Sequence, residues 1–169
     1  MSRAKIATVW LDGCSGCHMS LLDIDEGLLA VAEKADLVYG PLVDAQEFPP
    51  NVDVTLVEGA VSSQDDLKLL QKVRANTRVL VSLGDCAVTA NVPSMRNGIP
   101  PKQLLASIYT KPPTDGVPAL LKNALPVHEV VKVDLHVPGC PPKPEAILYV
   151  LGELLEGRKP ELAGKVKFG

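Results

Sequence analysis

Short runs of apolar residues, rich in valine, isoleucine and leucine, recur along this chain and are separated by polar segments. Five such runs predict strands, at residues 4–11, 36–40, 52–58, 77–83 and 131–137. Most of them are nearly continuous rather than strictly alternating. Continuous apolar runs are typical of strands that helices cover on both faces of a sheet.

A second pattern places apolar residues three or four positions apart, which predicts amphipathic helices. It covers residues 18–34, 63–75 and 143–156. Strands that alternate with helices form a parallel sheet with helices on both faces. The sequence therefore predicts an α/β fold, a doubly wound parallel sheet of flavodoxin-like type, as one domain over residues 1–169.

One segment, residues 91–126, departs from this pattern. It contains seven of the 15 prolines, and only residues 103–109 have helical spacing. Long irregular segments are uncommon in compact domains unless they are functional or covered by a partner. We expect a Pro-rich irregular insertion here, which is either a plain surface excursion or a functional segment, namely a docking surface or a wall around the site.

Composition excludes several classes of function. The chain is 46% hydrophobic and 22% charged, with a net charge of -3 and only 4% aromatic residues. Nucleic acid and anionic membranes are therefore not expected as partners. No run approaches the roughly 18 apolar residues of a membrane span, and the N-terminus lacks the pattern of a signal peptide. These features predict a cytoplasmic protein without a membrane span.

The four cysteines all follow predicted strands. Cys14 and Cys17 come after strand 4–11, Cys86 after strand 77–83 and Cys140 after strand 131–137. The carboxyl ends of parallel strands meet at one edge of a sheet, where open α/β folds bind ligands. Four thiols far apart in sequence are therefore expected to converge there.

Glycines accompany the cysteines, among them Gly13, Gly16 and Gly139. Glycine allows the backbone to turn sharply and to approach a bulky centre. Backbone N–H groups can then donate hydrogen bonds to the sulfurs of a thiolate-bound cluster. These glycines are therefore candidates for the shell around the site.

Several kinds of site could use these thiols. Buried structural cysteines are expected within strands or helices rather than in loops, and zinc sites usually combine two close pairs. A thioredoxin-like CxxC would leave Cys86 and Cys140 unexplained. There is no GxGxxG or Walker-type motif, and the Cys pair occupies the loop that a flavodoxin uses for its FMN phosphate. An iron–sulfur cluster uses all four thiolates and is the favoured interpretation.

Two further polar residues lie near the expected site. Glu58 ends strand 52–58, where it could contact the shell of the cluster, carry protons or simply cap the following helix. His18 follows Cys17 and could support the cluster from its shell. His128 lies apart from these residues in the sequence, and His136, in a predicted strand, is better explained as a core or surface histidine than as a ligand.

These motifs resemble the small subunit of nickel–iron hydrogenases and the related 20-kilodalton subunit of respiratory NADH dehydrogenase. The motifs that carry the resemblance are Trp10-Leu11-x-Gly13-Cys14-x-Gly16-Cys17, Glu58-Gly59-Ala60, Gly84-x-Cys86-Ala87 and Pro138-Gly139-Cys140-Pro141-Pro142. They span residues 10–142 in the expected order. The resemblance implies that the four cysteines bind one [4Fe-4S] cluster, which relays electrons from a nickel–iron centre in a separate large subunit.

Differences among the related proteins indicate which type of small subunit this chain resembles. The respiratory subunit carries adjacent cysteines where this chain has Cys14-Ser15-Gly16-Cys17. Periplasmic and membrane-bound hydrogenases carry a twin-arginine leader and a C-terminal extension with two further clusters. The chain is most similar to small subunits of cytoplasmic, NAD-reducing hydrogenases. This resemblance implies diaphorase partners that carry FMN and further iron–sulfur clusters.

Two alternatives stay open. Subunits of sulfhydrogenases or of cofactor-reducing hydrogenases share the same motifs, and some soluble hydrogenases have been proposed to hold an extra flavin. A different class of function is a zinc-stabilised adaptor that organises a complex without transferring electrons.

Overall fold

The centre of the protein is a parallel five-stranded sheet with the strand order β2-β1-β3-β5-β7. The structure is a computed structural model that describes residues 3–112 and 115–169. The strands are β1 (Ala4–Trp10), β2 (Ala35–Tyr39), β3 (Val52–Glu58), β5 (Thr77–Leu83) and β7 (Leu135–Val137). This order is that of flavodoxin-like folds, so the predicted fold class is confirmed.

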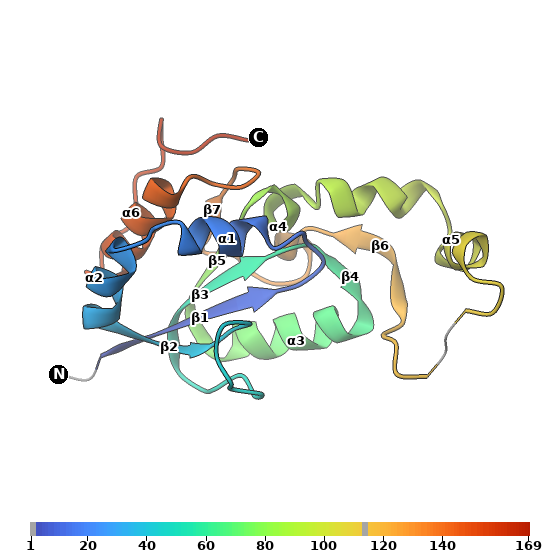
Figure 1. Ribbon diagram of the computed structural model, residues 1–169, viewed down its shortest axis with the longest axis horizontal. Helices are drawn as coiled ribbons and strands as arrows, with labels where there is room; N and C mark the ends of the chain where they lie inside the picture. Colours follow the sequence, from blue (N-terminus) through green and yellow to red (C-terminus); the bar gives the residue numbers. More distant parts are fainter. Residues whose placement is uncertain (1–2, 113–114) are drawn as a thin grey trace.

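Helices cover both faces of the sheet (Figure 1). The described helices are α1 (Gly16–Leu22), α2 (Gly27–Lys34), α3 (Gln64–Ala75), α4 (Asp85–Thr89), α5 (Pro101–Ile108) and α6 (Pro144–Leu155), with the 3-10 helices η1 (Val92–Gly98) and η2 (Val127–Glu129). Of these, α5 and η1 lie beside the main sheet rather than on it. No helix in the described ranges is both long enough and apolar enough to cross a membrane.

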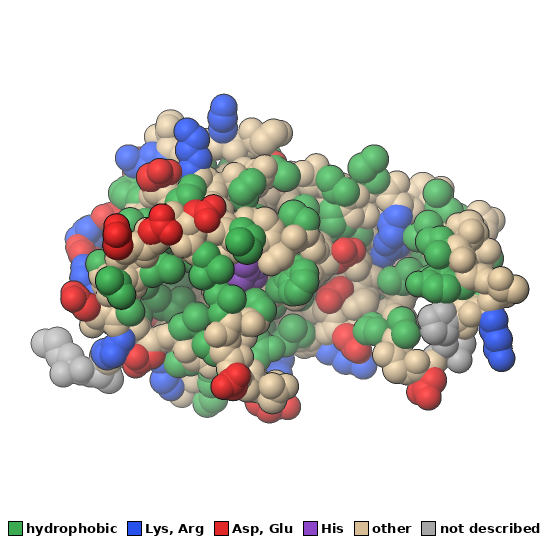
Figure 2. Space-filling model, in the orientation of Figure 1, with side chains coloured by type: hydrophobic (Ala, Val, Ile, Leu, Met, Phe, Trp, Pro, Cys, Tyr) green, Lys and Arg blue, Asp and Glu red, His purple; other side chains and the backbone are tan. Residues whose placement is uncertain are grey.

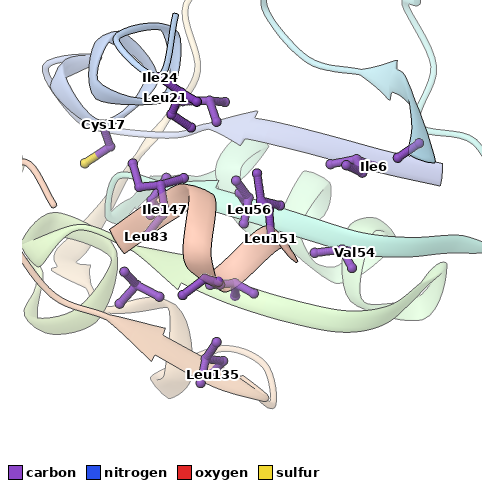
Figure 3. Packing of buried hydrophobic residues seen from close by; sticks show 14 residues of the cluster. Ile6, Cys17, Leu21, Ile24, Val54, Leu56, Leu83, Leu135, Ile147 and Leu151 are labelled. Atoms are coloured by element: carbon purple, nitrogen blue, oxygen red, sulfur yellow. The ribbon is translucent and has the colours of Figure 1, made fainter. Parts of the chain in front are cut away.

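Two separate apolar cores lie on the two faces of the sheet. On one face, Leu21 of α1 and Ile147 of α6 pack against Leu56 of β3. On the other face, Leu70 of α3 packs with Val57 of β3. Figure 3 shows the first core, with Cys17 at its margin and its sulfur pointing away from the other labelled side chains.

The strand register aligns the ends of the sheet. Trp10 of β1 pairs with Glu58 of β3, which pairs in turn with Leu83 of β5. Leu83 also pairs with Val137 of β7. Four neighbouring strands therefore end at the same level, and the loops that follow them start side by side.

The single helix predicted over 18–34 is wrong, because the structure contains two helices there. The helix α1 ends at Leu22, and a turn over residues 23–26 separates it from α2. The second helix lies close against α6, since a Cβ on Gly27 would lie 3.1 Å from a methyl carbon of Leu148. The apolar spacing continues through the turn, which is why the sequence does not reveal the break.

The strand predicted over 131–137 is also too long, because β7 contains only Leu135–Val137. The carboxylate of Asp134 accepts a hydrogen bond from the backbone N–H of Leu80 at 2.8 Å. The backbone N–H of Asp134 donates to the carbonyl of Leu80 at 2.9 Å. A side chain thus satisfies a strand N–H that a longer β7 would have paired.

Residues 91–126, here called the arm, are more regular than the sequence predicts. They contain η1 and α5, and they end in the strand β6 (Leu120–Leu125). This strand pairs antiparallel with β4 (Val61–Ser63) to form a second, two-stranded sheet. The arm extends to the right of the main sheet in Figure 1. The helix predicted at 103–109 corresponds to α5, whereas β4 and β6 were not predicted.

Replacement of Asp134 by alanine tests the contact that ends β7. Burial acts to raise the pKa of Asp134, but hydrogen bonds from Leu80 and Arg74 outweigh it and hold the pKa below its ordinary value of 3.8. We expect Asp134→Ala to lower the free energy of unfolding by about 1–2 kcal/mol at neutral pH, because a strand N–H loses its acceptor. Urea denaturation measures the change.

The sign of the pH dependence follows from the lowered pKa. A carboxylate with a lowered pKa stabilises the fold above its unfolded pKa, and this contribution is lost as the pH falls through its folded value. The difference between Asp134→Ala and the wild type should therefore shrink below about pH 3.8. The exposed Asp44→Ala is the matched control. Equal stability of the two variants at neutral pH would contradict the role given to Asp134.

Candidate metal centre

Three loops that carry the cysteines meet at the carboxyl edge of the main sheet. The loop after β1 leads through Cys14 into α1, and Cys17 is the second residue of that helix. Cys86 is the second residue of α4, directly after β5. Cys140 lies in the loop between β7 and α6. Cys17 and Cys86 therefore lie in first helical turns rather than in the loops predicted for them.

The loop after β1 is fixed by backbone contacts to β3 and the residues after it. Asp12 and Ala60 exchange two backbone hydrogen bonds, at 3.0 and 2.8 Å. The N–H of Gly16 donates to the sulfur of Cys14 at 3.4 Å. A Cβ on Gly13 would lie 3.1 Å from the Cα of Gly59. A side chain at Gly13 or Gly16 would therefore crowd this loop.

Gly84 brings the β5 loop close to Cys17. A Cβ at Gly84 would lie only 2.2 Å from the sulfur of Cys17, and its φ of +83° favours glycine. The absence of a side chain at Gly84 thus leaves a space, here called the cradle, for the thiol of Cys17 from α1. The motif around Cys86 contains Gly84, but its sequence alone does not indicate this role.

The buried carboxylate of Asp85 joins the β5 and β7 loops. Its Oδ1 atom accepts a hydrogen bond from the N–H of Gly139 at 2.6 Å. The N–H of Asp85 donates to the carbonyl of Gly139 at 2.9 Å. A third connection runs from the hydroxyl of Ser20, on α1, to the carbonyl of Pro142. All three cysteine-bearing loops are therefore connected to one another.

Exposure differs strongly among the four free thiols. Cys17 is buried and Cys86 is intermediate, whereas Cys14 and Cys140 are exposed. The site is thus closed on the side of the core and open on the side of the solvent.

The thiols influence one another electrostatically. Burial raises the pKa of Cys17, and the charges of Glu58, Cys86, Cys14 and Cys140 raise it further. Burial also raises the pKa of Cys86, with contributions from Cys14 and Cys140, while a hydrogen bond from the backbone of Val92 acts in the opposite direction. Positive charge among the sulfurs would relieve this repulsion, as a bound metal does for coordinating thiols.

Glu58 and His18 form a buried polar pair behind Cys17. The carboxylate of Glu58 accepts hydrogen bonds from the N–H of Cys17 at 3.4 Å and of His18 at 3.0 Å. It also contacts Nδ1 of His18. Glu58 therefore caps α1, which begins beside the site. The alternative that it caps the following helix is wrong, because Ser63 and Asp66 form the capping box of α3.

One atom of this pair lacks a partner. Nε2 of His18 is buried, and it finds no hydrogen-bond partner among the residues that the structure describes. The other two histidines lie elsewhere. His136 is in β7, where its Nδ1 is 2.8 Å from the hydroxyl of Ser82, and its ring packs against His128.

The residues at this edge fit a cluster bound by four thiolates. The donor set consists of four free cysteines from three connected loops, and Gly84 leaves room beside the most buried sulfur. Within the described residues, no three His, Cys, Asp or Glu side chains are grouped closely enough to hold a single metal ion. A four-iron cluster makes a different demand, because each thiolate binds a different corner of the cluster.

The chain is similar in sequence to subunits of known hydrogenases. The chain matches the NAD-reducing hydrogenase HoxS subunit delta of Cupriavidus necator with 38% identity, over 97% of this chain and 84% of that protein. It is 36% identical to a subunit of the F420-non-reducing hydrogenase of Methanococcus voltae, and it spans 60% of that subunit. The class is therefore that of subunits of hydrogenases, oxidoreductases that act on hydrogen.

A structural relative agrees with this class. A chain from the crystal structure of an NAD+-reducing [NiFe]-hydrogenase in the H2-reduced state superposes with a TM-score of 0.95 and 36% identity, covering 99% of this chain and all of that one. The profile of the family described as NADH ubiquinone oxidoreductase, 20 Kd subunit, matches residues 14–154. The protein belongs to that family.

A methyl group at Gly84 tests whether the cradle beside Cys17 is needed. We expect Gly84→Ala to lose more than half of the bound iron after anaerobic reconstitution, because the added Cβ would overlap the sulfur of Cys17. Gly152→Ala in α6 is the matched control, since a Cβ there meets nothing within 4 Å. Iron and sulfide analysis measures the result. Full iron content in Gly84→Ala would show that the close approach is not required.

Proposed function

We propose that this chain is the electron-transfer small subunit of a [NiFe] hydrogenase and that Cys14, Cys17, Cys86 and Cys140 hold one [4Fe-4S] cluster. The observation that carries the proposal is the connection of three loops, which brings four free thiols to one edge of the sheet. Such a cluster accepts and returns one electron at a time.

The chain's own residues give the cluster an asymmetric environment. Cys17 would hold it on the side of the core, where burial excludes water, and the half-buried Cys86 would bind it between the core and the solvent. Gly16 and Gly84 keep the backbone close to the sulfurs of Cys14 and Cys17, and the N–H of Gly16 already donates to Cys14. Gly13 and Gly139 lie against the backbones of Gly59 and Pro142 and leave room for the close approach of the loops. Hydrogen bonds to sulfur and local burial are the means by which a protein sets a cluster's potential.

Glu58 and His18 act as positioning residues in this proposal. Glu58 fixes the first turn of α1 through the N–H groups of Cys17 and His18. It thereby holds the Cys17 sulfur in place and adds a negative charge behind the cluster. The same buried pair is the candidate for a proton path, since His18 keeps one ring nitrogen without a partner among the described residues.

The partners follow from the relatives. We infer a large subunit that carries the nickel–iron centre, and a diaphorase module with FMN and further iron–sulfur clusters that reduces NAD. The names of the Cupriavidus necator relative and of the structural neighbour both specify NAD reduction. The F420-non-reducing relatives and sulfhydrogenase 2 subunit delta of Pyrococcus furiosus make other acceptors the alternative. A complex that uses the NAD pool is expected in the cytoplasm.

Serine at Cys86 tests the ligand set. We expect Cys86→Ser to impair cluster assembly and to reduce hydrogen-dependent NAD+ reduction by at least tenfold, because an alcohol is a poorer iron ligand than a thiolate. Iron content and electron paramagnetic resonance of the anaerobically purified chain measure the cluster. Thr89→Ser on the same helix is the control, since serine can keep the hydrogen bond to Asp85.

Two results would count against the relay. Unchanged iron content in Cys86→Ser would remove this residue from the ligand set. A colourless wild-type chain loaded with zinc would favour the adaptor instead.

Replacement of Glu58 by glutamine separates its charge from its size. The reduced cluster carries one more negative charge, so removal of the nearby carboxylate favours reduction. We expect Glu58→Gln to raise the cluster's reduction potential by an amount on the order of tens of millivolts, with the iron content retained. A redox titration followed by electron paramagnetic resonance measures the shift. An unchanged potential would leave Glu58 with a structural role alone.

A further inference from the structure

Polar side chains attach η1 to the small β4–β6 sheet. Arg96 donates to the carbonyls of Ser62 and Leu121, at 3.0 and 3.2 Å. Asn97 exchanges two hydrogen bonds with the backbone of Ala124, at 2.9 and 2.7 Å. These partly buried contacts hold η1 in place, although η1 itself contains no buried residue.

Several apolar residues of the arm face solvent, whereas Ala124 of β6 is buried. Neither η1 nor α5 contains a buried residue. Met95 is 79% exposed, Ile108 67% and Val92 61%, and Ile99, Tyr109 and Val117 are exposed as well. Figure 2 shows hydrophobic side chains gathered at the arm, on the right of the molecule. Exposed apolar residues gathered on one segment indicate an interaction site.

The charge of the arm differs from that of the rest of the chain. It contains four basic residues and one acidic residue, which gives a net charge of +3, whereas the whole chain has -3. Lys102 and Lys111 are among its exposed basic residues. A partner surface complementary to the arm would therefore be apolar at its centre and acidic at its rim.

The arm is continuous with the metal site. It starts two residues after α4, which carries Cys86. The side chain of Val92 is one of the exposed apolar groups. A partner that contacts this end of the arm would therefore lie near one proposed cluster ligand.

We propose that the exposed face of η1 and α5 is the docking surface for the hydrogenase large subunit, which covers Val92, Met95 and Ile108 with an apolar groove bordered by acidic side chains. This inference rests on the proposed function and names the partner that the arm contacts. Docking there would place the Cys86 side of the site at the interface.

The relatives favour the large subunit over the electron-accepting module. The matches to the NAD-reducing and F420-non-reducing relatives each cover 97% of this chain, so they extend across the arm. The names of these relatives differ in the acceptor, but both are hydrogenases. The partner class that both names share is the hydrogen-activating one, so we assign the arm to the large subunit rather than to an acceptor module.

The test compares two exposed apolar surfaces of the same chain. The double variant Met95→Gln/Ile108→Gln changes the arm, and Leu29→Gln on α2, a residue that is 68% exposed, is the matched control. Native mass spectrometry of the cluster-loaded complex over a dilution series measures the dissociation constant for the large subunit. We expect the arm variant to raise it at least tenfold, while Leu29→Gln stays within twofold of the wild type.

A charge variant provides a second test that does not alter apolar packing. Lys102→Glu/Lys111→Glu should weaken association at least threefold and make it less sensitive to salt, because an attraction between exposed charges is lost. Lys68→Glu on α3, also strongly exposed, is its control. If the apolar double variant loses iron, the charge variant alone decides whether the arm binds the large subunit.

Several outcomes would overturn the inference. The arm is not the docking surface if both arm variants bind the large subunit like the wild type. It faces the diaphorase instead if hydrogen-dependent NAD+ reduction falls while the large subunit stays bound and dye reduction is unchanged. A change only in self-association would assign the surface to a second copy. A wild-type chain without iron would overturn the relay itself, which iron analysis distinguishes from failure of the arm.

Discussion

The buried carboxylate of Asp85 is the contact on which the geometry of the site depends. It accepts the N–H of Gly139 through one oxygen, and the backbones of the two residues pair in return. The β5 and β7 strands are paired over only three residues, so their loops need this connection to keep a common arrangement. Cys86 and Cys140 stand directly beside the two connected residues. The connection between Asp85 and Gly139 therefore fixes the backbone on which Cys86 and Cys140 stand, so that the spacing of these thiols does not depend on their own side chains alone.

The site is buried on the side of the core and exposed on the side of the solvent. The core side is formed by Cys17 and His18, in the first turn of α1, and by Glu58, which accepts hydrogen bonds from that turn. The solvent side exposes Cys14 and Cys140 and continues into the arm. A relay needs both features, since burial controls the potential and an open side lets a second redox centre approach. The proposed function and the proposed docking surface are thus two consequences of one asymmetric site.

The sequence predicts those parts of the structure that depend on local patterns. Buried strands appear as apolar runs, and the cysteines after them could be placed at one edge because parallel strands all end there. The break between α1 and α2 could not be found, because apolar spacing continues through it and its close contact is to the distant α6. The early end of β7 depends on Asp134 and Leu80, which lie 54 positions apart. The need for glycine at position 84 likewise cannot be predicted locally, because it depends on the sulfur of Cys17, which lies in α1.

The position of Gly169 links the metal-binding edge to a residue that is distant in the sequence. Its N–H donates to the second oxygen of Asp85 at 2.9 Å, and a Cβ on it would lie 2.7 Å from the Cβ of Cys140. The Asp85 carboxylate thus accepts hydrogen bonds from the backbones of both Gly139 and Gly169. A larger residue at position 169 would therefore press on Cys140, although the two positions are far apart along the chain.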